Sequence, residues 1–220
     1  MDIVLITNGW VFVCALIGFI YGVRAFIKNG KILFARMITF GIACMMYARL
    51  FQIIFILTQG ELKAGFDIST LGVAGSFMFL LSANYGQMDS LVDDGSKKFL
   101  HIRLISLVAP AIVIGLYALF LTKIDVPGII VGTGIVTLFM IPCIYYNFKH
   151  LIIFDVDLGL IRTLRLYNVL AIAFVFSVGF EFFGVYTDNT PMFVAAMVIQ
   201  GLLSIAIPLA VRKGVAKWTI

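Results

Sequence analysis

Two charged side chains of opposite sign, Arg49 and Glu181, lie inside apolar stretches and are the strongest candidates for chemistry. Arg49 belongs to the stretch 34–58 and, by helical rise, lies on the order of 13 Å from its outer end. A lysine or arginine deep in a membrane helix costs about 2.5 to 3.5 kcal/mol, so it usually faces protein or water and has a partner. Glu181 is the comparably buried acid. We therefore predict that the two side chains form an ion pair in a polar interior.

Other polar residues fall on the same helix faces. Gln52 lies three positions after Arg49, and Ser177 lies one turn before Glu181, while Gln200 stands near the middle of the last apolar stretch. Arg49 would neutralise an anionic solute or the Glu181 carboxylate, and Glu181 would accept a hydrogen-bond donor or a coupling proton. The alternative is a buried pair that only fixes the register of the helices. The predicted ligand-binding residues are Arg49, Gln52, Asn84, Ser177, Glu181 and Gln200.

Asn84 is the outlying member of that set. With Tyr85 and Gln87 it lies toward the inner end of the third apolar stretch. It either closes the far side of a cavity or is an ordinary polar residue at a helix end.

An acidic cluster, Asp89, Asp93 and Asp94, follows the third apolar stretch, and Asp155 and Asp157 lie in a later joint. Carboxylates at a membrane face can hold a divalent ion that bridges a lipid phosphate. A CDP-alcohol phosphotransferase motif, however, would need an acid where Leu91 stands. The spacing by four from Asp89 through Asp93 to Lys97 instead favours ion pairing along a helix that extends past the membrane. A lipid-headgroup enzyme remains the lesser alternative.

Several catalytic and cofactor motifs are missing from the sequence, namely HExxH, GxSxG, the P-loop and GxGxxG. His101 and His150 have no Cys or His at ligand spacing, so we expect them at the membrane interface. Cys14, Cys44 and Cys143 lie within apolar runs and are typical of small buried side chains. We expect no catalytic residue, no metal and no cofactor.

Composition indicates that the lipid bilayer surrounds these elements. The chain of 220 residues is 62% hydrophobic and 12% charged, whereas soluble domains are about 25% charged. The sequence predicts an all-α polytopic membrane protein with a single seven-helix domain. The net charge of +5 does not indicate nucleic acid, because the basic residues gather at one membrane face. The predicted spans are 4–27, 33–58, 69–88, 99–122, 128–148, 164–187 and 190–211.

The distribution of Lys and Arg predicts the orientation. Placing the N-terminus outside and the C-terminus inside leaves only Lys63 and Lys123 in outer joints, with Arg49 inside a span. We predict a bacterial inner (plasma) membrane protein with this orientation. The remaining basic residues then lie at inner ends: Arg24, Lys28, Lys31, Arg36, Lys97, Lys98, Arg103, Lys149, Arg162, Arg165, Arg212, Lys213 and Lys217.

A 3+1+3 parallel repeat would join residues 1–98 and 124–220 around a linker helix at 99–122. Sliding the second span by 129 positions sets Arg36 on Arg165 and Gln52 on Glu181. Apolar segments also align by chance, so repeat and coincidence both stay open.

Two function classes fit this layout. The first is a small-solute transporter, anionic or proton-coupled, with its substrate at the polar intramembrane site. The alternative is a receptor-like sensor that binds a small molecule and signals through a protein partner docked at Asp89–Lys98. Rhodopsin-like receptors and SWEET carriers share only the seven-span plan. Residues 191–211 lack the lysine that a retinal protein needs, and Pro142 is the only proline matching the SWEET pattern. The sequence identifies no family.

Overall fold

The computed structural model describes residues 2–28, 33–60, 65–89, 93–153 and 160–215, which form an all-helical bundle. Within these ranges, seven helical segments are long and apolar enough to cross a membrane, which is typical of an integral membrane protein. The elements are α1 Asp2–Gly22, η1 Val23–Ile27, α2 Leu33–Gln59, α3 Ile68–Ala83, η2 Asn84–Asp89, η3 Lys97–Phe99, α5 Leu100–Ser106, α6 Val108–Leu121, α7 Pro127–Ile152, α8 Leu160–Tyr186 and α9 Thr190–Val215.

The seven predicted spans are confirmed, with small differences at their ends. The helices of the fifth and seventh spans run on to Ile152 and Val215, four residues past the predicted ends at 148 and 211. The third helical segment, predicted over 69–88, begins at Ile68 and continues through η2 to Asp89. The predicted and observed helices agree because a long apolar segment in lipid must satisfy its backbone hydrogen bonds internally, which an α-helix does.

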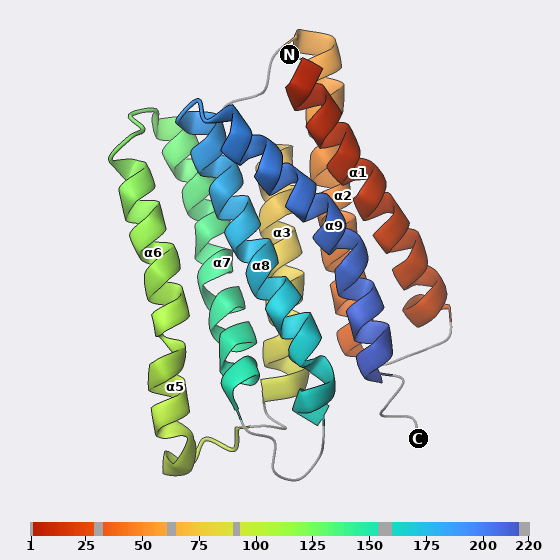
Figure 1. Cartoon of the computed structure of the whole chain (residues 1–220), viewed down its shortest axis with the longest axis vertical. Coiled ribbons are helices and arrows are strands. Elements are labelled where there is room, and N and C mark those ends of the chain that lie inside the picture. Colours follow the sequence, from red (N-terminus) through yellow and green to blue (C-terminus); the bar gives the residue numbers. More distant parts are fainter. Residues whose placement is uncertain (1, 29–32, 61–64, 90–92, 154–159, 216–220) are drawn as a thin grey trace.

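Six of the helices form a closed ring, in which α1, α2, α3, α7, α8 and α9 each pack against the next and α9 returns to α1. Helix α6 lies outside the ring against α7 and α8 (Figure 1). The chain enters at one end of the bundle, where α1 begins, and α9 ends at the opposite end (Figure 1). The polar residues singled out above therefore come from helices that share one interior.

Small residues set the closest helix contacts. A Cβ atom on Gly18 would lie 2.2 Å from the backbone oxygen of Ser204, and one on Gly72 would lie 2.9 Å from that of Cys44. Glycine at these positions lets the backbones of α1 and α9, and of α2 and α3, approach one another.

One proline interrupts its helix and two do not. The fourth span divides at Leu107 into α5 and α6, three residues before Pro110. Because proline has no N–H and clashes with the carbonyl four residues earlier, this break is expected. Pro142 and Pro208 lie inside the continuous helices α7 and α9.

The two halves of the interior differ in polarity. In the half away from the N-terminus, aromatic side chains pack in the interior, and the polar residues Asn84, Asn147, Asn168, Lys149 and His150 are buried there as well. The rings of Phe77 and Phe174 lie 5.7 Å apart, and those of Phe34 and Tyr167 lie 5.4 Å apart. All four of these rings are buried. Polar side chains gather in the other half, near the turns between α2 and α3 and between α8 and α9.

Candidate functional site

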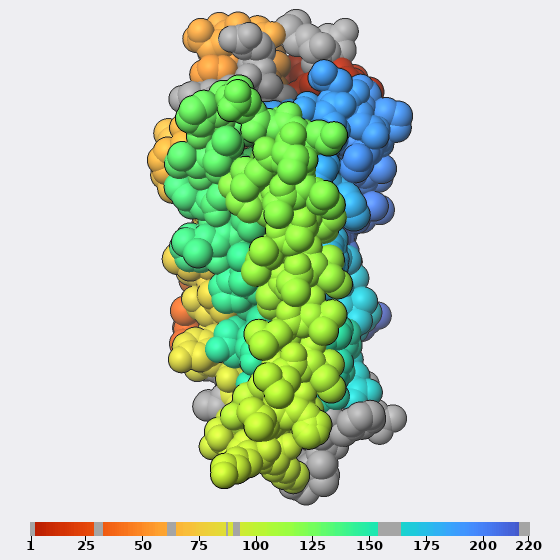
Figure 2. Space-filling view, turned by 90° about the vertical axis from the view of Figure 1, so that its left-hand side faces the viewer, coloured from red at the N-terminus to blue at the C-terminus, as the bar shows by residue number. Residues whose placement is uncertain are grey.

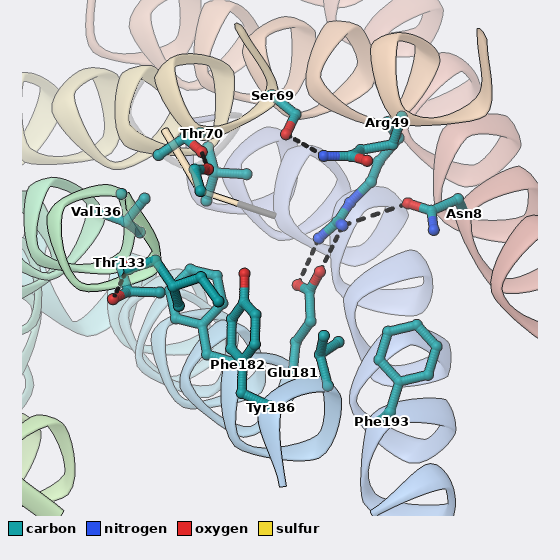
Figure 3. Close-up of a pocket in the computed structure, with 16 residues that line it drawn as sticks. Asn8, Arg49, Ser69, Thr70, Thr133, Val136, Glu181, Phe182, Tyr186 and Phe193 are labelled. Carbon is teal, nitrogen blue, oxygen red and sulfur yellow. Dashed lines mark hydrogen bonds and ion pairs between the residues drawn. The ribbon is translucent and has the colours of Figure 1, made fainter. Parts of the chain in front are cut away.

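Arg49 and Glu181 form a two-pronged ion pair between α2 and α8 (Figure 3). Arg49 Nη1 donates to Glu181 Oε1 and Arg49 Nη2 to Glu181 Oε2, both at 2.6 Å. The side chains are 4% and 8% exposed as whole residues, so neither charge is solvated to any extent. Parallel N–H···O bonds of this kind are strong and fix the relative orientation of both groups. The predicted pairing is confirmed.

Two amides complete the surroundings of the pair. Gln200 on α9 accepts from Arg49 Nη2 at 2.7 Å and donates to Glu181 Oε2 at 2.8 Å, so it closes a three-membered network. Asn8 on α1 accepts from Arg49 Nη1 at 3.4 Å (Figure 3). The network therefore joins α1, α2, α8 and α9, four of the six ring helices.

The α8–α9 hairpin holds the acid beside its amide partner. A tight turn with Asp188 in the left-handed region, at φ 53°, joins the two helices. Asn189 supports the start of α9, because its side chain accepts from the backbone N–H of Met192 at 3.1 Å. Ser177, one turn below Glu181, accepts from Gln200 through its backbone oxygen at 3.3 Å, while its hydroxyl donates to Phe174. Ser177 thus supports Gln200 and does not touch the ion pair.

Gln52 belongs to a neighbouring polar group at the start of α3. Its side-chain nitrogen donates to Ser69 and, at 3.4 Å, to Asp67. Asp67 is the N-cap of α3 and accepts from the backbone N–H of Thr70 at 2.8 Å. A carboxylate at a helix N-terminus is stabilised both by this bond and by the helix dipole. The cap therefore holds the amide of Gln52 in one orientation.

A chamber opens beside both polar groups (Figure 3). The empty space of the chamber up to its open mouth is about 640 Å³. Its wall combines polar and apolar side chains: Asn8, Arg49, Gln52, Ser69, Thr70, Val73, Ile129, Thr133, Val136, Glu181, Phe182, Val185, Tyr186 and Phe193, with Gly65 and Gly132.

Two buried polar atoms of the chamber wall have no partner among the described residues. Arg49 Nε is a donor, and Gln52 Oε1 is an acceptor. A buried polar group without a hydrogen bond costs about 1 to 3 kcal/mol, so such groups normally bind water or a ligand. Two residues that line the chamber therefore carry one unpaired donor and one unpaired acceptor, while the central charges stay paired.

Asn84 is not part of this chamber. It begins η2, at the opposite end of α3 from Ser69. Asn84 is 1% exposed, and neither its side-chain oxygen nor its nitrogen has a partner among the described residues. The structure thus brings five of the six predicted residues together, four in the networks above and Ser177 behind them, and leaves Asn84 apart.

A second charged cluster lies near Asn84 and corrects the predicted pairing of Asp93. Lys149 Nζ lies 2.6 Å from Asp89 Oδ1 and 2.7 Å from Asp93 Oδ2. Arg103 donates to Asp93 through Nε at 2.7 Å, and His150 Nε2 lies 3.2 Å from Asp89. The predicted pairing of Asp93 with Lys97 is wrong, because residues 93–96 do not continue the helix. Lys149 and His150 are only 3% and 2% exposed, and both lie within α7, which continues to Ile152.

This cluster shifts the titration of its carboxylates. Hydrogen bonds from Arg103, and then from Lys149, hold the pKa of the Asp93 carboxyl well below its usual range. Burial tends to raise the pKa of Asp89, but hydrogen bonds from His150 and Lys149 outweigh it and leave that pKa lowered. Both acids therefore stay ionised around neutral pH. Among the described residues no group of three or more His, Cys, Asp or Glu is arranged to hold a metal.

Some residues singled out in the sequence lie outside the described part of the chain. These are Asp155 and Asp157, together with Lys31, Lys63, Leu91, Lys217 and the side chains of Gln87 and Arg162.

Sequence reasoning missed several members of the site, and some of them carry a signal. Asp67 precedes an apolar helix and is followed by Ser69 and Thr70, the pattern of an N-cap. Asn8 is an amide inside the first apolar stretch, and its side chain, like that of Arg49, needs a hydrogen-bond partner there. Tyr186 resembles any aromatic residue at a helix end, and only the packing of α7 against α8 places it at the chamber.

Comparison of the chain with protein-family models, with curated proteins and with solved structures finds no match.

Proposed function

We propose that this protein is a carrier for a small carboxylic acid, taken up together with a proton. One observation carries the proposal: a buried Arg49–Glu181 pair forms part of the wall of a chamber, and two of the lining residues carry an unpaired donor and an unpaired acceptor. Ionisable residues inside membrane bundles are typical of substrate and proton pathways.

The hydrogen-bond pattern supports a protonated acid as the guest. A carboxylic acid has one acceptor, its carbonyl oxygen, and one donor, its hydroxyl. Arg49 Nε donates to the former and Gln52 Oε1 accepts from the latter, so both orphaned atoms gain a partner. If the guest ionises in the chamber, Glu181 takes the proton and the guest carboxylate replaces it as the partner of Arg49. The buried arginine keeps a counter-charge throughout, and this avoids the cost of an unpaired buried ion.

Orientation and symmetry belong to the same proposal. Counting Lys and Arg places the N-terminus outside, so the chamber would face the outer side and the Phe77–Phe174 layer would close the inner side. The ring of helices supports two three-helix units, α1–α3 and α7–α9, because the contact of α3 with α7 has a counterpart in that of α9 with α1. Helix α6 would then be the linker. Carriers built from such repeats bind substrate between the halves, and the chamber here is lined by residues of both units.

Uptake into proteoliposomes tests the proposal. With a proton gradient as the driving force, the initial rate of labelled acetate uptake should be higher in vesicles with the wild-type protein than in empty vesicles, into which the neutral acid also diffuses. Glu181→Gln keeps the shape of the side chain and removes its charge, so it should lower the initial rate to that of empty vesicles. Arg212→Gln changes an exposed arginine outside the site and serves as the control. Wild-type uptake by Glu181→Gln, with native folding confirmed by its elution and melting, would refute the assignment of the site.

A sensor is the second candidate, and the closed inner half of the bundle favours it. Asp89 and Asp93 are engaged within the chain, so a partner docking at Asp89–Lys98 would meet the exposed Asp94, Lys97 and Lys98. Replacing residues 94–98 by a Gly/Ser linker separates the two candidates. A carrier retains uptake, whereas a sensor loses its partner in a pull-down.

A further inference from the structure

A second hollow lies between α6, α7 and α8, on the side of α7 and α8 away from the ring interior. It holds about 380 Å³ of empty space up to its open mouth. Most of its wall is hydrocarbon: Val113, Leu116, Tyr117, Phe120, Thr137, Met140, Val175, Phe176, Gly179, Phe182 and Phe183. We refer to it as the α6 groove.

The polar atoms of the α6 groove are already satisfied. The hydroxyl of Tyr117 donates to the backbone oxygen of Ile130 at 2.8 Å, and that of Thr137 donates to Thr133 at 2.8 Å. With those bonds made, the groove offers apolar contacts and no free hydrogen-bond donor to a guest. It is therefore suited to a hydrocarbon chain.

One side chain belongs to both hollows. Phe182 lines the polar chamber and also the α6 groove. On α7 the chamber residues Thr133 and Val136 are followed within a turn by the groove residues Thr137 and Met140. Figure 3 shows Phe182 next to Tyr186 on the chamber wall. Phe182 thus borders both a polar compartment and an apolar one.

The α6 groove also faces the part of the molecule that lipid would surround. Helix α6 exposes Ile112, Ile114 and Leu119 along its outer side, and Figure 2 shows this helix lying over the same face of the bundle as α7 and α8. Gly179 leaves room in the groove, since a Cβ atom there would first meet Met140 Cε at 3.8 Å. A chain that enters from the bilayer can therefore reach Phe182 without crossing a polar layer.

We infer that the substrate is an amphiphile: a carboxylic acid whose head lies in the chamber and whose hydrocarbon tail passes Phe182 into the α6 groove. The inference rests on the proposed function and narrows it from small acids in general to acids with an aliphatic tail. Head and tail each meet matching chemistry, because the orphaned Arg49 Nε and Gln52 Oε1 lie in one compartment and the apolar wall lies in the other.

Filling the groove tests the inference. Gly179→Leu places a branched side chain in the α6 groove, and Gly115→Leu places the same side chain on α6 where nothing lies within 4 Å of the new Cβ. Binding of labelled acetate and decanoate is measured in nanodiscs for both variants. We expect Gly179→Leu to weaken decanoate binding at least tenfold and to leave acetate unchanged, while Gly115→Leu changes neither. If the wild-type protein binds neither acetate nor decanoate, the proposed function itself is overturned. If Gly179→Leu binds decanoate as tightly as the wild type does, only the tail assignment is overturned.

Photolabelling of the wild-type protein gives a second test that needs no variant. Decanoic acid with a diazirine at its far end should mark residues of the α6 groove, chiefly Met140, Tyr117 and Phe120, and excess unlabelled decanoate should suppress these adducts. Adducts confined to outward-facing side chains such as Ile112 and Leu119 would overturn the inference, since a bulk lipid would leave the same marks.

Discussion

Replacing Arg49 by methionine isolates the energetics of the buried pair. The change removes both bonds to Glu181, the bond to Gln200 and the one to Asn8. Glu181 Oε1 then has no donor among the described residues, and Oε2 keeps only the amide of Gln200. Breaking a buried pair from one side costs about 3 to 5 kcal/mol, because the remaining charge is left uncompensated. We expect Arg49→Met to lose stability in this range.

The double variant Arg49→Met/Glu181→Leu removes the stranded charge along with its partner. Apolar replacements of buried pairs are often neutral or stabilising by about 1 to 4 kcal/mol. The double variant should therefore be more stable than Arg49→Met by at least 3 kcal/mol, the lower bound of the cost of leaving one buried charge unpaired. It should still fail to take up acetate, since the polar wall of the chamber is gone.

Reversible unfolding in mixed micelles measures both free energies, with Arg212→Met as the control for loss of an exposed arginine. Arg212 is exposed and donates to Tyr21 at 3.0 Å, so its removal should change stability by less than about 1 kcal/mol. Equal stability of Arg49→Met and the double variant would contradict the reasoning, because it would mean that Glu181 is solvated or protonated when alone.

Two further predictions concern pH and packing. The pKa of Asp93 is depressed in the fold, so its contribution to stability is present above the ordinary carboxyl pKa of 3.8 and is lost as the pH falls below that value. The difference in melting temperature between the wild type and Asp93→Asn should therefore be constant from pH 8 to 5 and shrink below about pH 4. Gly18→Ala should destabilise by about 1 to 3 kcal/mol through its clash with Ser204, whereas Gly9→Ala in the same helix, with nothing within 4 Å, should be neutral or mildly stabilising in the same unfolding assay.

The helices were predictable because the membrane imposes a simple rule. A segment such as Leu33–Gln59 must satisfy its backbone internally and expose apolar side chains, and both demands appear in a single sliding average of hydropathy. The same average fails at the end of α7, where Lys149 and His150 look like a joint between helices. The charge of Lys149 is neutralised by Asp89, 60 residues earlier, and no local signal reveals a contact at that separation.

The centre of the site was predictable by cost and elimination. An arginine in mid-span needs a partner, and Glu181 was the comparably buried acid, so the pairing followed without knowledge of helix packing. The packing itself was not accessible. Which face of α7 meets α8 decides that Tyr186 and Phe182 line the chamber. These choices depend on side-chain shape across helices, which spacing along one helix does not encode.

The distance along the chain between Arg49 and Glu181, 132 residues, has a consequence for how the protein is made. During synthesis the second helix reaches the membrane long before the acid has been translated, whereas Glu181 and Gln200 arrive together on one hairpin. Until that hairpin arrives, the guanidinium of Arg49 lacks its carboxylate partner. Insertion of the last two helices thus completes the site.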